Sequence, residues 1–573
     1  MSFAFCFTAV NVLSSLCISM GTCLLWSGGP TVMVWGWFVV SFFTIIVGCS
    51  MGEVCSTYPS AGSVYHWTGQ LAPEKWAPLI AYICGWFNFM CVHARRSGAL
   101  RVRRSGCAVL TAHRNARRGN VAGDAAFAYG FANFVNAARE IQKCPRDIDE
   151  LYLGALTNGI IDTSSSSSST TTTTAMVPPC DGSYSVGAQV GIAMGVCFCW
   201  AAMNVSRVDA QGWMNNLAMG WQIAATIAIV VVLLVHAGQN DDFQSDHFTW
   251  EIWRNRTGLG DNNFGYVILI GLLSSLFSFS GYEAGAHMAE ETRNASLSSA
   301  LGLLATVFVC SLTGILYILG CIYSIPKRLG VFMALTAYGS PLPSLFCVVC
   351  GNRVGLALTN VVVTTLFFAG MSSLTVTSRI GFALARDGAF PGSSYLRRVN
   401  PTTKSPIPMV VLVLVIDCLL LLLPLATMQL DSQYGAIAFN AVTSICVIGY
   451  QISYCIPLML RGTVMANTFV QSTFSLGRAG PVVANIAWIW LFITSLFLFW
   501  PSTFPVNQYN MNYTVVVVAG FFVIALLWWT LGGARHFFKG PMRVDANVFK
   551  QIAREASAAA AAAAEGNKYQ TVM

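Results

Sequence analysis

The chain of 573 residues is 55% hydrophobic and only 10% charged, and its mean hydropathy is +0.60. This composition excludes an ordinary soluble globular protein, and its continuous apolar segments exclude a transmembrane barrel, whose strands alternate over about ten residues. The formal charge of +8 does not indicate nucleic-acid binding, because the basic residues lie in loops between apolar segments. The sequence therefore predicts an all-α polytopic membrane protein.

Hydropathy and helix-breaking residues predict about twelve transmembrane helices, because about 20 apolar residues are needed to cross a bilayer. They form one membrane domain over residues 1–541, followed by a cytoplasmic tail at 542–573. The chain opens directly in an apolar segment, which we expect to act as its own insertion signal, and Met1 is a candidate internal start. The predicted spans are 3–26, 32–51, 76 onward, 186–204, 214–236, 264–289, 300–325, 356–378, 409–428, 434–460, 482–500 and 513–530.

The positions of lysine and arginine predict the orientation, because cytoplasmic loops are enriched in them. The loop after the eighth span carries several basic residues against one acid, Asp387, and more follow the tenth and the last spans. An even number of spans then places both termini in the cytoplasm, and we expect the plasma membrane rather than an internal one. The basic residues are Arg379, Arg386, Arg397, Arg398, Lys404, Arg461, Arg478, Arg535, Lys539 and Arg543.

Two segments do not fit a series of spans and short loops. Residues 91–118 bring many arginines into the third span, which then resumes its apolar pattern at Gly119. We interpret 91–118 as a retained intron or a gene-model error, since its removal restores one uninterrupted helix. The alternative is a basic re-entrant loop that binds anionic lipid. Residues 163–175 are a loop rich in serine and threonine, which predicts disorder and O-glycosylation.

A polar stretch near the end of the sixth span, 278–283 with the sequence SFSGYE, is the strongest candidate site. An ionisable group within a span is costly, so Glu283 is either a functional group or a solvated, paired residue at the cytoplasmic end. Gly281 is either a break in the helix or a close helix contact. Together they favour a broken helix whose backbone groups face a cavity that a polar solute fills.

Motifs of catalytic or metal-binding proteins do not occur in the sequence. It has no Walker-type, Rossmann or nucleophile-elbow pattern, and its 19 cysteines lie singly without metal-ligand spacing. We therefore predict no enzyme, no metal site and no cofactor. Asp124 and Asp417 are further carboxylates within spans, and they either relay protons or are paired.

Several motifs resemble the amino acid-polyamine-organocation permeases. The stretch GEVCSTYPSAGSVYHW at 52–67 resembles the segment after the second span of that superfamily. Other stretches resemble its eukaryotic branch of amino acid, GABA and choline permeases. They are LAPEKWAP at 71–78, GWFN at 85–88, GYEAGAHMAEET at 281–292, VTSR at 376–379, ARDG at 385–388 and FSLGR at 474–478.

The resemblance implies a five-plus-five inverted repeat with two further helices, in which the first and sixth spans are interrupted and receive the substrate. The matching place in the first span is near Ser14 and Ser15, where the superfamily often has glycine. In the sixth span Gly281 would allow unwinding, Ser280 would border the substrate, Phe279 and Tyr282 would wall or gate the pocket, and Glu283 would take an amine or a proton.

The resemblance also suggests how transport is coupled to an ion. Ser372 and Ser373 in the eighth span lie where related folds place hydroxyls for sodium, although contacts between helices are the more common reason for such hydroxyls. Asp124 and Asp417 are the candidates for protons. The fifth span lacks the lysine that replaces sodium in some relatives, so the coupling ion, H⁺ or Na⁺, stays open.

The function that the resemblance implies is secondary active transport of amino acids, or of related amines such as GABA, by alternating access. The expected partners are a small-molecule substrate and the lipid bilayer, and no oligomeric state is predicted. The alternatives are a choline or polyamine permease and a nutrient sensor of the same fold that binds its solute without moving it. A chain that is inactive because of residues 91–118 is a further alternative.

Overall fold

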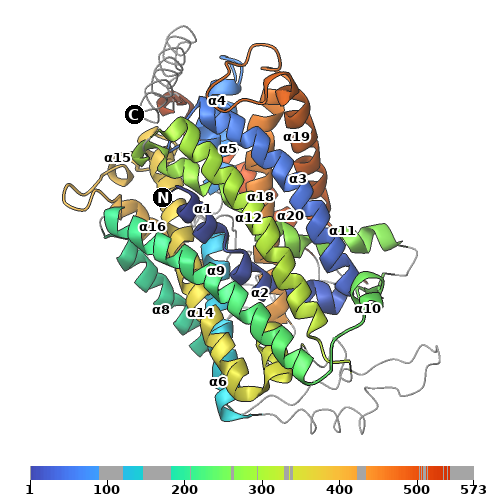
Figure 1. Cartoon of the computed structure of the whole chain (residues 1–573). Coiled ribbons are helices and arrows are strands. Elements are labelled where there is room, and N and C mark those ends of the chain that lie inside the picture. The colour runs from blue at the N-terminus through green and yellow to red at the C-terminus, as the bar shows by residue number, and fades with distance from the viewer. Residues whose placement is uncertain are drawn as a thin grey trace, which may run out of the picture.

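The computed structural model shows a single bundle of long helices (Figure 1). Residues 91–118, 163–175 and 542–573 lie outside the described part of the chain, so the predictions made for them stay predictions. The structure describes residues 2–89, 121–145, 182–206, 208–259, 263–292, 294–327, 335, 338, 340–422, 434–501, 504, 506, 512, 514–532, 534–538 and 540–541.

Apolar helices dominate the described residues, and this confirms an all-α polytopic membrane protein. Nine of them are long and apolar enough to cross a membrane, and three further apolar helices there are shorter. The elements are α1 (Ser2–Val10), α2 (Val12–Trp26), β1 (Ser27–Gly28), α3 (Gly29–Thr57), α4 (Ser63–Leu71), α5 (Ala77–Phe89), α6 (Val121–Lys143), α8 (Val186–Asn204), α9 (Val208–Gln239), α10 (Asp246–Trp250), β2 (Arg254–Asn255), α11 (Phe264–Ser278), η2 (Tyr282–Glu291), α12 (Ala295–Tyr323), α14 (Pro341–Arg386), α15 (Ser393–Leu396), α16 (Ile407–Leu421), α18 (Tyr434–Gly462), η4 (Gly477–Ala479), α19 (Gly480–Phe497), α20 (Thr514–Thr530) and α21 (Ala534–Phe537), with β1 and β2 paired antiparallel.

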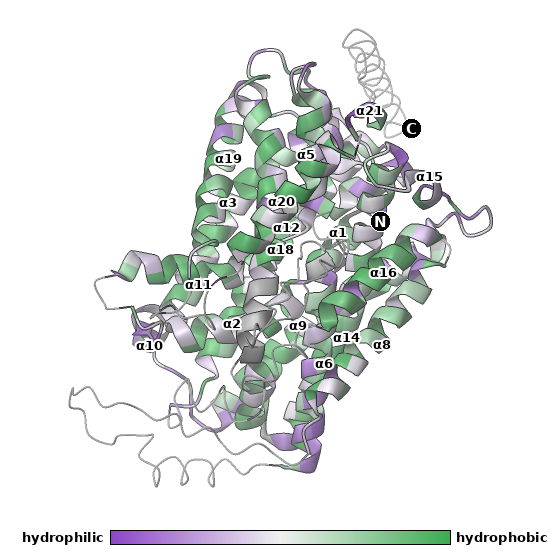
Figure 2. Cartoon of the chain, turned by 180° about the vertical axis from the view of Figure 1, so that it is seen from behind, coloured by the Kyte–Doolittle hydropathy of each residue, from purple (hydrophilic) through white to green (hydrophobic). Residues whose placement is uncertain are grey.

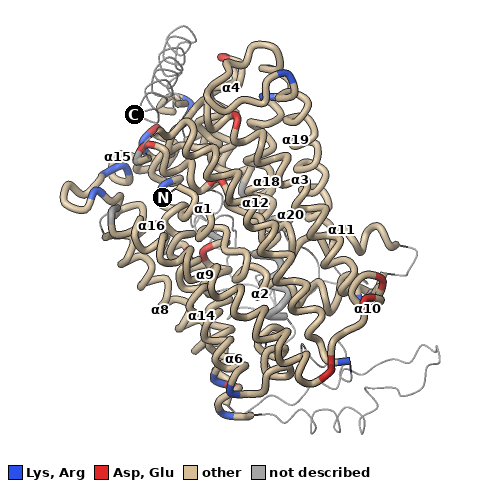
Figure 3. Tube along the Cα trace, viewed as in Figure 1, with Lys and Arg blue, Asp and Glu red and all other residues tan. Residues whose placement is uncertain are grey.

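Both the core and the outer surface of the bundle are apolar. Phe42, Trp213 and Phe308 are 61%, 67% and 63% exposed. Hydrophobic residues run along outer helices such as α3, α16 and α19 (Figure 2), and charged residues are sparse along the middle of the bundle (Figure 3). Large side chains of this kind facing outward match contact with lipid tails rather than with water.

The first span is interrupted at Asn11, three residues before Ser14. Asn11 has a left-handed backbone with φ of 39°, a conformation that asparagine adopts more readily than most residues. Its side chain accepts a hydrogen bond from the backbone N–H of Ser14 at 3.1 Å and donates one to the carbonyl of Thr365 at 3.1 Å. The interruption is therefore held by a side-chain amide and needs no glycine.

The sixth span is interrupted at Gly281, between α11 and the 3₁₀ helix η2. Gly281 has φ of 86°, which costs little for a residue without a Cβ atom. Its N–H group donates to the hydroxyl of Tyr454 at 3.2 Å, so α18 supports the broken backbone. Because α2 packs against α11, the two interrupted spans lie side by side in the bundle.

The observed helices differ from the predicted spans mainly at their ends. Helix α3 continues to Thr57, past the predicted end at Met51, and α14 covers 341–386 with a non-helical Gly351 where the eighth span was predicted at 356–378. Hydropathy ends a span where the sequence turns polar, whereas α3 continues because Glu53, Ser56 and Thr57 are buried in the bundle. Helices α5 and α6 border residues 90–120, so the continuous third span remains a prediction.

Candidate functional site

A pocket lies where the two interrupted spans meet. Its walls come from α1, α2, α6, α11, α14 and α18, and they combine apolar and aromatic side chains with hydroxyl groups. The residues that line it are Ala9, Val10, Ser15, Gly123, Phe127, Phe277, Ser280, Gly281, Ser373, Val376, Cys446 and Tyr450. Cavities of this composition, mainly apolar with a few polar groups, are typical of small-molecule sites.

Four of the candidate residues line this pocket. They are Ser15 on α2, Ser280 and Gly281 at the break after α11, and Ser373 on α14. Three segments distant in sequence therefore bring their hydroxyl and backbone groups to one place. The lining set also includes Tyr450, which the sequence analysis missed.

Ser14, Phe279 and Tyr282 do not line the pocket, and each packs elsewhere. The Ser14 hydroxyl donates to Thr365 Oγ1 at 3.2 Å, and the Phe279 ring lies 4.7 Å from the Trp37 ring between centroids. The Tyr282 ring lies 5.2 Å from that of Tyr454. These residues support the walls rather than form the surface that a solute would touch.

Glu283 is fully buried beside the pocket, and its partner is a tyrosine. Tyr454 donates its hydroxyl proton to Glu283 Oε2 and also accepts from the N–H of Gly281. The other carboxylate oxygen, Oε1, has no hydrogen-bond partner within the described residues. Glu283 is thus neither at a solvated end nor on the pocket surface, and Tyr454 connects it to the break.

The helix ends at the two breaks provide complementary charge. Helix α2 begins just after Asn11 and η2 begins just after Gly281, so N–H groups with partial positive charge point to this region. Helices α1 and α11 end there, at Val10 and Ser278, and they contribute carbonyl groups with partial negative charge. The arrangement suits a solute with both a carboxylate and an ammonium group.

The remaining candidates lie behind the α14 wall. The Ser372 hydroxyl donates to Asn215 Oδ1 at 2.5 Å, which joins α14 to α9. Ser373 donates to Asp124 Oδ1, and Asp417 on α16 is fully buried without a hydrogen-bond partner among the described residues. Ser372 therefore acts as a contact between helices, whereas Ser373 touches both the pocket and a buried acid.

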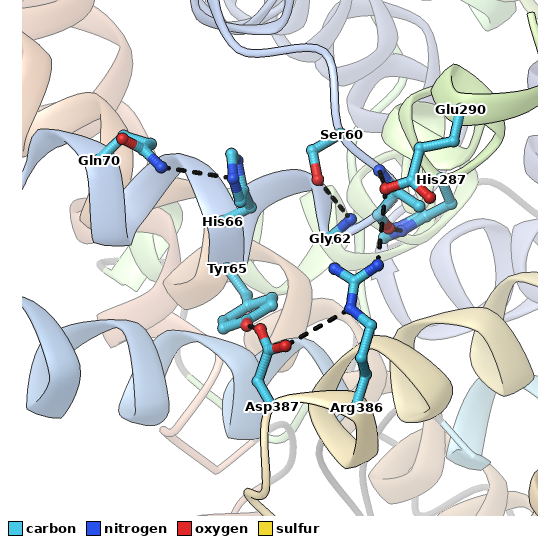
Figure 4. A network of polar contacts seen from close by, with 10 residues as sticks. Ser60, Gly62, Tyr65, His66, Gln70, His287, Glu290, Arg386 and Asp387 are labelled. Carbon is cyan, nitrogen blue, oxygen red and sulfur yellow. Dashed lines mark hydrogen bonds and ion pairs between the residues drawn. The ribbon is translucent and has the colours of Figure 1, made fainter. Parts of the chain in front are cut away.

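A polar network joins α14, α4 and η2 at one end of the bundle (Figure 4). Tyr65 donates to Asp387 Oδ2, Arg386 Nε lies 3.4 Å from Asp387 Oδ1, and Arg386 Nη1 lies 3.7 Å from Glu290 Oε1. Glu290 accepts from the N–H of Ala61 at 3.2 Å. We call these residues the Arg386 network; it connects three elements that must separate if this end of the bundle opens.

Burial shifts the pKa of two groups beside the Arg386 guanidinium. It raises the pKa of Asp387 to about 6, because removal from water disfavours the charged carboxylate. Burial, helped by the positive charge of Arg386, lowers the pKa of His66 to about 4. Near pH 6 this end of the bundle therefore gains or loses a negative charge while His66 stays neutral.

A buried ion pair joins α3 to α18 near the same end. Arg461 Nε and Nη2 each lie 3.0 Å from Glu53 Oε2, and the two residues are 2% and 0% exposed. The backbone N–H of Leu476 donates to Glu53 Oε1 at 3.1 Å. Arg461 was expected only to flank a cytoplasmic loop, and no local signal shows that it pairs with an acid 408 residues away.

Comparisons with known proteins identify the family of this chain. The model of the amino acid permease family matches residues 2–94 and 128–522, and the unmatched stretch overlaps the arginine-rich segment. Amino-acid permease BAT1 of Arabidopsis thaliana is 30% identical over 94% of this chain and 92% of its own length. The GABA-specific permease of Saccharomyces cerevisiae is 24% identical over 94% and 81%. The chain belongs to the amino acid permease family, and this membership supports transport of amino acids across a membrane.

Proposed function

We propose that the chain is a secondary active transporter that carries an amino acid through the pocket at the two breaks by alternating access. One observation carries the proposal: Ser15, Ser280, Gly281 and Ser373, from three separate spans, line a single pocket where two helices are interrupted. Interrupted helices at the level of a buried cavity are a device by which transporters hold a polar solute without lipid-exposed backbone.

The helix ends predict the orientation of the substrate. A carboxylate is favoured near the N–H groups at the starts of α2 and η2. The hydroxyls of Ser15 and Ser280 donate to the carbonyls of Val10 and Leu276, and they would have to turn to donate to it. An ammonium group is favoured near the final carbonyls of α1 and α11. The rings of Phe127, Phe277 and Tyr450 then contact the apolar part of the solute.

Alternating access requires that one end of the bundle opens while the other closes. The Arg386 network is suited to hold one end closed reversibly, because its ion pairs are partly exposed and little free energy is needed to separate them. The Glu53–Arg461 pair is dry and costly to separate, so we expect α3 and α18 to move together at that end. The positions of the basic loops favour this end as the cytoplasmic one.

The substrate panel follows from the pocket and from the relatives. GABA belongs in it because one relative is named a GABA-specific permease. Choline and polyamines lack a carboxylate and would leave the donors at the helix starts without a partner, although the aromatic walls also suit a quaternary ammonium. A sensor of the same fold would bind an amino acid and not exchange it.

The test is counterflow in proteoliposomes that contain the purified chain. Vesicles loaded with each unlabelled amino acid, GABA, choline or a polyamine are diluted into the labelled solute. We expect exchange of an amino acid or GABA, and loss of exchange in Gly281→Leu, whose side chain would reach toward Tyr450 at the pocket. Gly392→Leu is the matched control, because Gly392 also has positive φ but open space around it. Binding without exchange would indicate a sensor, and exchange of choline alone would refute the assignment to amino acids.

A further inference from the structure

Two buried carboxylates lie behind the wall of the pocket. Asp124 on α6 and Asp417 on α16 are each 0% exposed, and the two helices pack against each other. Helix α8 packs against both of these helices and carries the buried thiol of Cys197. The two carboxylates therefore lie in the dry interior where α6, α8 and α16 pack together.

The oxygen atoms of this pair are largely without partners. Asp124 Oδ1 accepts from Ser373, but Asp124 Oδ2 and both oxygens of Asp417 have no hydrogen-bond partner within the part of the chain that the structure describes. An unpaired, fully buried carboxylate is among the most costly groups a protein can hold. Such atoms indicate a ligand that binds there.

The groups that face the pair do not neutralise it. They are Cys197 from α8, Cys418 beside Asp417 on α16, Cys446 from α18, and the hydroxyls of Ser373 and Thr377 from α14, with Glu283 beyond Cys446. No lysine or arginine among the described residues forms an ion pair with either carboxylate. Another source of positive charge is therefore needed.

We propose that Asp124 and Asp417 form a proton-binding site that is linked to the substrate pocket through Ser373. Two fully buried carboxylates on helices that pack together do not both ionise readily, and a proton held by Asp124 removes one charge and supplies one hydrogen-bond donor.

Ser373 provides the link because it touches both sites. It lines the pocket, and its hydroxyl donates to Asp124 Oδ1. A hydroxyl has a single proton to donate, so Ser373 cannot serve the ionised Asp124 and a carboxylate in the pocket at the same time. Once Asp124 is protonated it donates to Ser373, and Ser373 is free to donate to the substrate.

Proton and substrate therefore assist each other's binding, as in a symporter. This step rests on the proposed function, because it assumes a substrate with a carboxylate. By linkage, a proton that raises the affinity for the amino acid is itself bound more tightly when the amino acid is present. Ser373 is a positioning residue for the proton, whereas Asp124 holds it.

The first experiment tests the proton site without any substrate. Infrared difference spectra of the purified chain are recorded while the pH is raised, and the band of a protonated carboxylic acid is followed. We expect Asp124→Asn to remove a component of this band and Asp417→Asn to move the loss of that component to lower pH, whereas Glu283→Gln leaves it in place. If neither variant changes the band, both carboxylates are ionised and the proposal is overturned, whether or not the chain transports amino acids.

The second experiment tests the link to the pocket. Affinity for the transported amino acid is measured against pH, and we expect it to fall about ten-fold per pH unit once the site releases its proton, as one linked proton requires. Asp124→Asn, whose amide donates to Ser373 at every pH, should keep high affinity and lose the pH dependence. Asp417→Asn removes the neighbouring charge and should move the pH dependence to lower pH.

Ser373→Ala and Ser372→Ala form the matched pair for this measurement. Ser373→Ala should weaken binding and make it insensitive to pH, whereas Ser372→Ala removes a hydroxyl that bonds Asn215 and should retain the native pH profile. Equal effects of the two substitutions would overturn the link through Ser373. Affinity that depends on sodium and not on pH would overturn the assignment of the ligand as a proton.

Discussion

Removing one partner of the buried Glu53–Arg461 ion pair should strongly destabilise the protein. Arg461→Met keeps most of the side-chain volume but leaves the carboxylate of Glu53 uncompensated in a site where it is 0% exposed. The backbone N–H of Leu476 at 3.1 Å and the hydroxyl of Ser475 at 3.4 Å are then the donors that remain to it. Loss of one partner from a buried pair costs about 3–5 kcal/mol.

The double substitution separates the cost of an unpaired charge from the value of the pair. In Glu53→Leu/Arg461→Met both charges are absent, and the main loss is the acceptor for the N–H of Leu476, which costs about 1–3 kcal/mol. We therefore expect the double variant to be more stable than Arg461→Met alone. The exposed Arg397→Met is the control, and its effect should stay within about 0.5 kcal/mol.

The assay is denaturant unfolding of the purified protein in micelles, with the free energy of unfolding compared across the four variants and the native chain. The single Glu53→Leu variant completes the cycle and leaves Arg461 buried and unpaired. An effect of Arg461→Met below about 1 kcal/mol, or a double variant less stable than both singles, would refute the reasoning that the pair is dry and mutually compensating.

Three further predictions follow from local geometry. Gly480→Ala should destabilise the protein by about 1–3 kcal/mol, because a Cβ atom there would lie 2.4 Å from Arg461 Nη2; unfolding measurements that show no change would contradict it. The folded-state pKa of Asp387, about 6, lies above its ordinary value of 3.8, so this residue's contribution to stability is lost as pH rises from about 4 to 6. Asp387→Asn should therefore gain stability relative to the native chain over that pH range, and a constant difference between the two melting temperatures would exclude this. Gly281→Ala should cost about 1–2 kcal/mol for a side chain at positive φ, similar to Gly392→Ala, but only the first should reduce uptake; equal uptake in both would place the functional break elsewhere.

The sequence predicted the fold class and the broken sixth span because those features are local. A long apolar segment needs only its own residues to show that it crosses a membrane, and a glycine beside a carboxylate is visible within it. The first break was placed near Ser14 and Ser15 by resemblance, whereas Asn11 forms it. A lone amide in an apolar segment is a signal that would have identified Asn11.

The contacts that close the bundle could not be predicted, because they join residues far apart in sequence. Tyr454 bonds both Gly281 and Glu283, and nothing near Tyr454 in the sequence shows this. Arg461 looked like a loop residue by its position at the end of a span, but it is buried against Glu53. Rotation of a helix about its axis decides such partners, and hydropathy does not determine that rotation.

The sequence predicted several residues that line the pocket, but it did not predict the contacts that each candidate residue makes. Ser15, Ser280, Gly281 and Ser373 line the pocket, whereas Glu283 lies behind it. A carboxylate in a span suggests a ligand contact on energetic grounds alone. Whether it faces the solute or a tyrosine depends on the unwinding that Gly281 permits.

The rate at which Cys446 reacts with N-ethylmaleimide tests the pocket assignment most directly, because this native thiol lines the pocket and needs no substitution. The modified fraction is measured by mass spectrometry with and without the transported amino acid, and Cys199, an exposed thiol on α8, is the internal control. We predict that the amino acid slows modification of Cys446 and leaves Cys199 unchanged. Unchanged modification of Cys446 at a saturating concentration of that amino acid would contradict binding between the two broken helices.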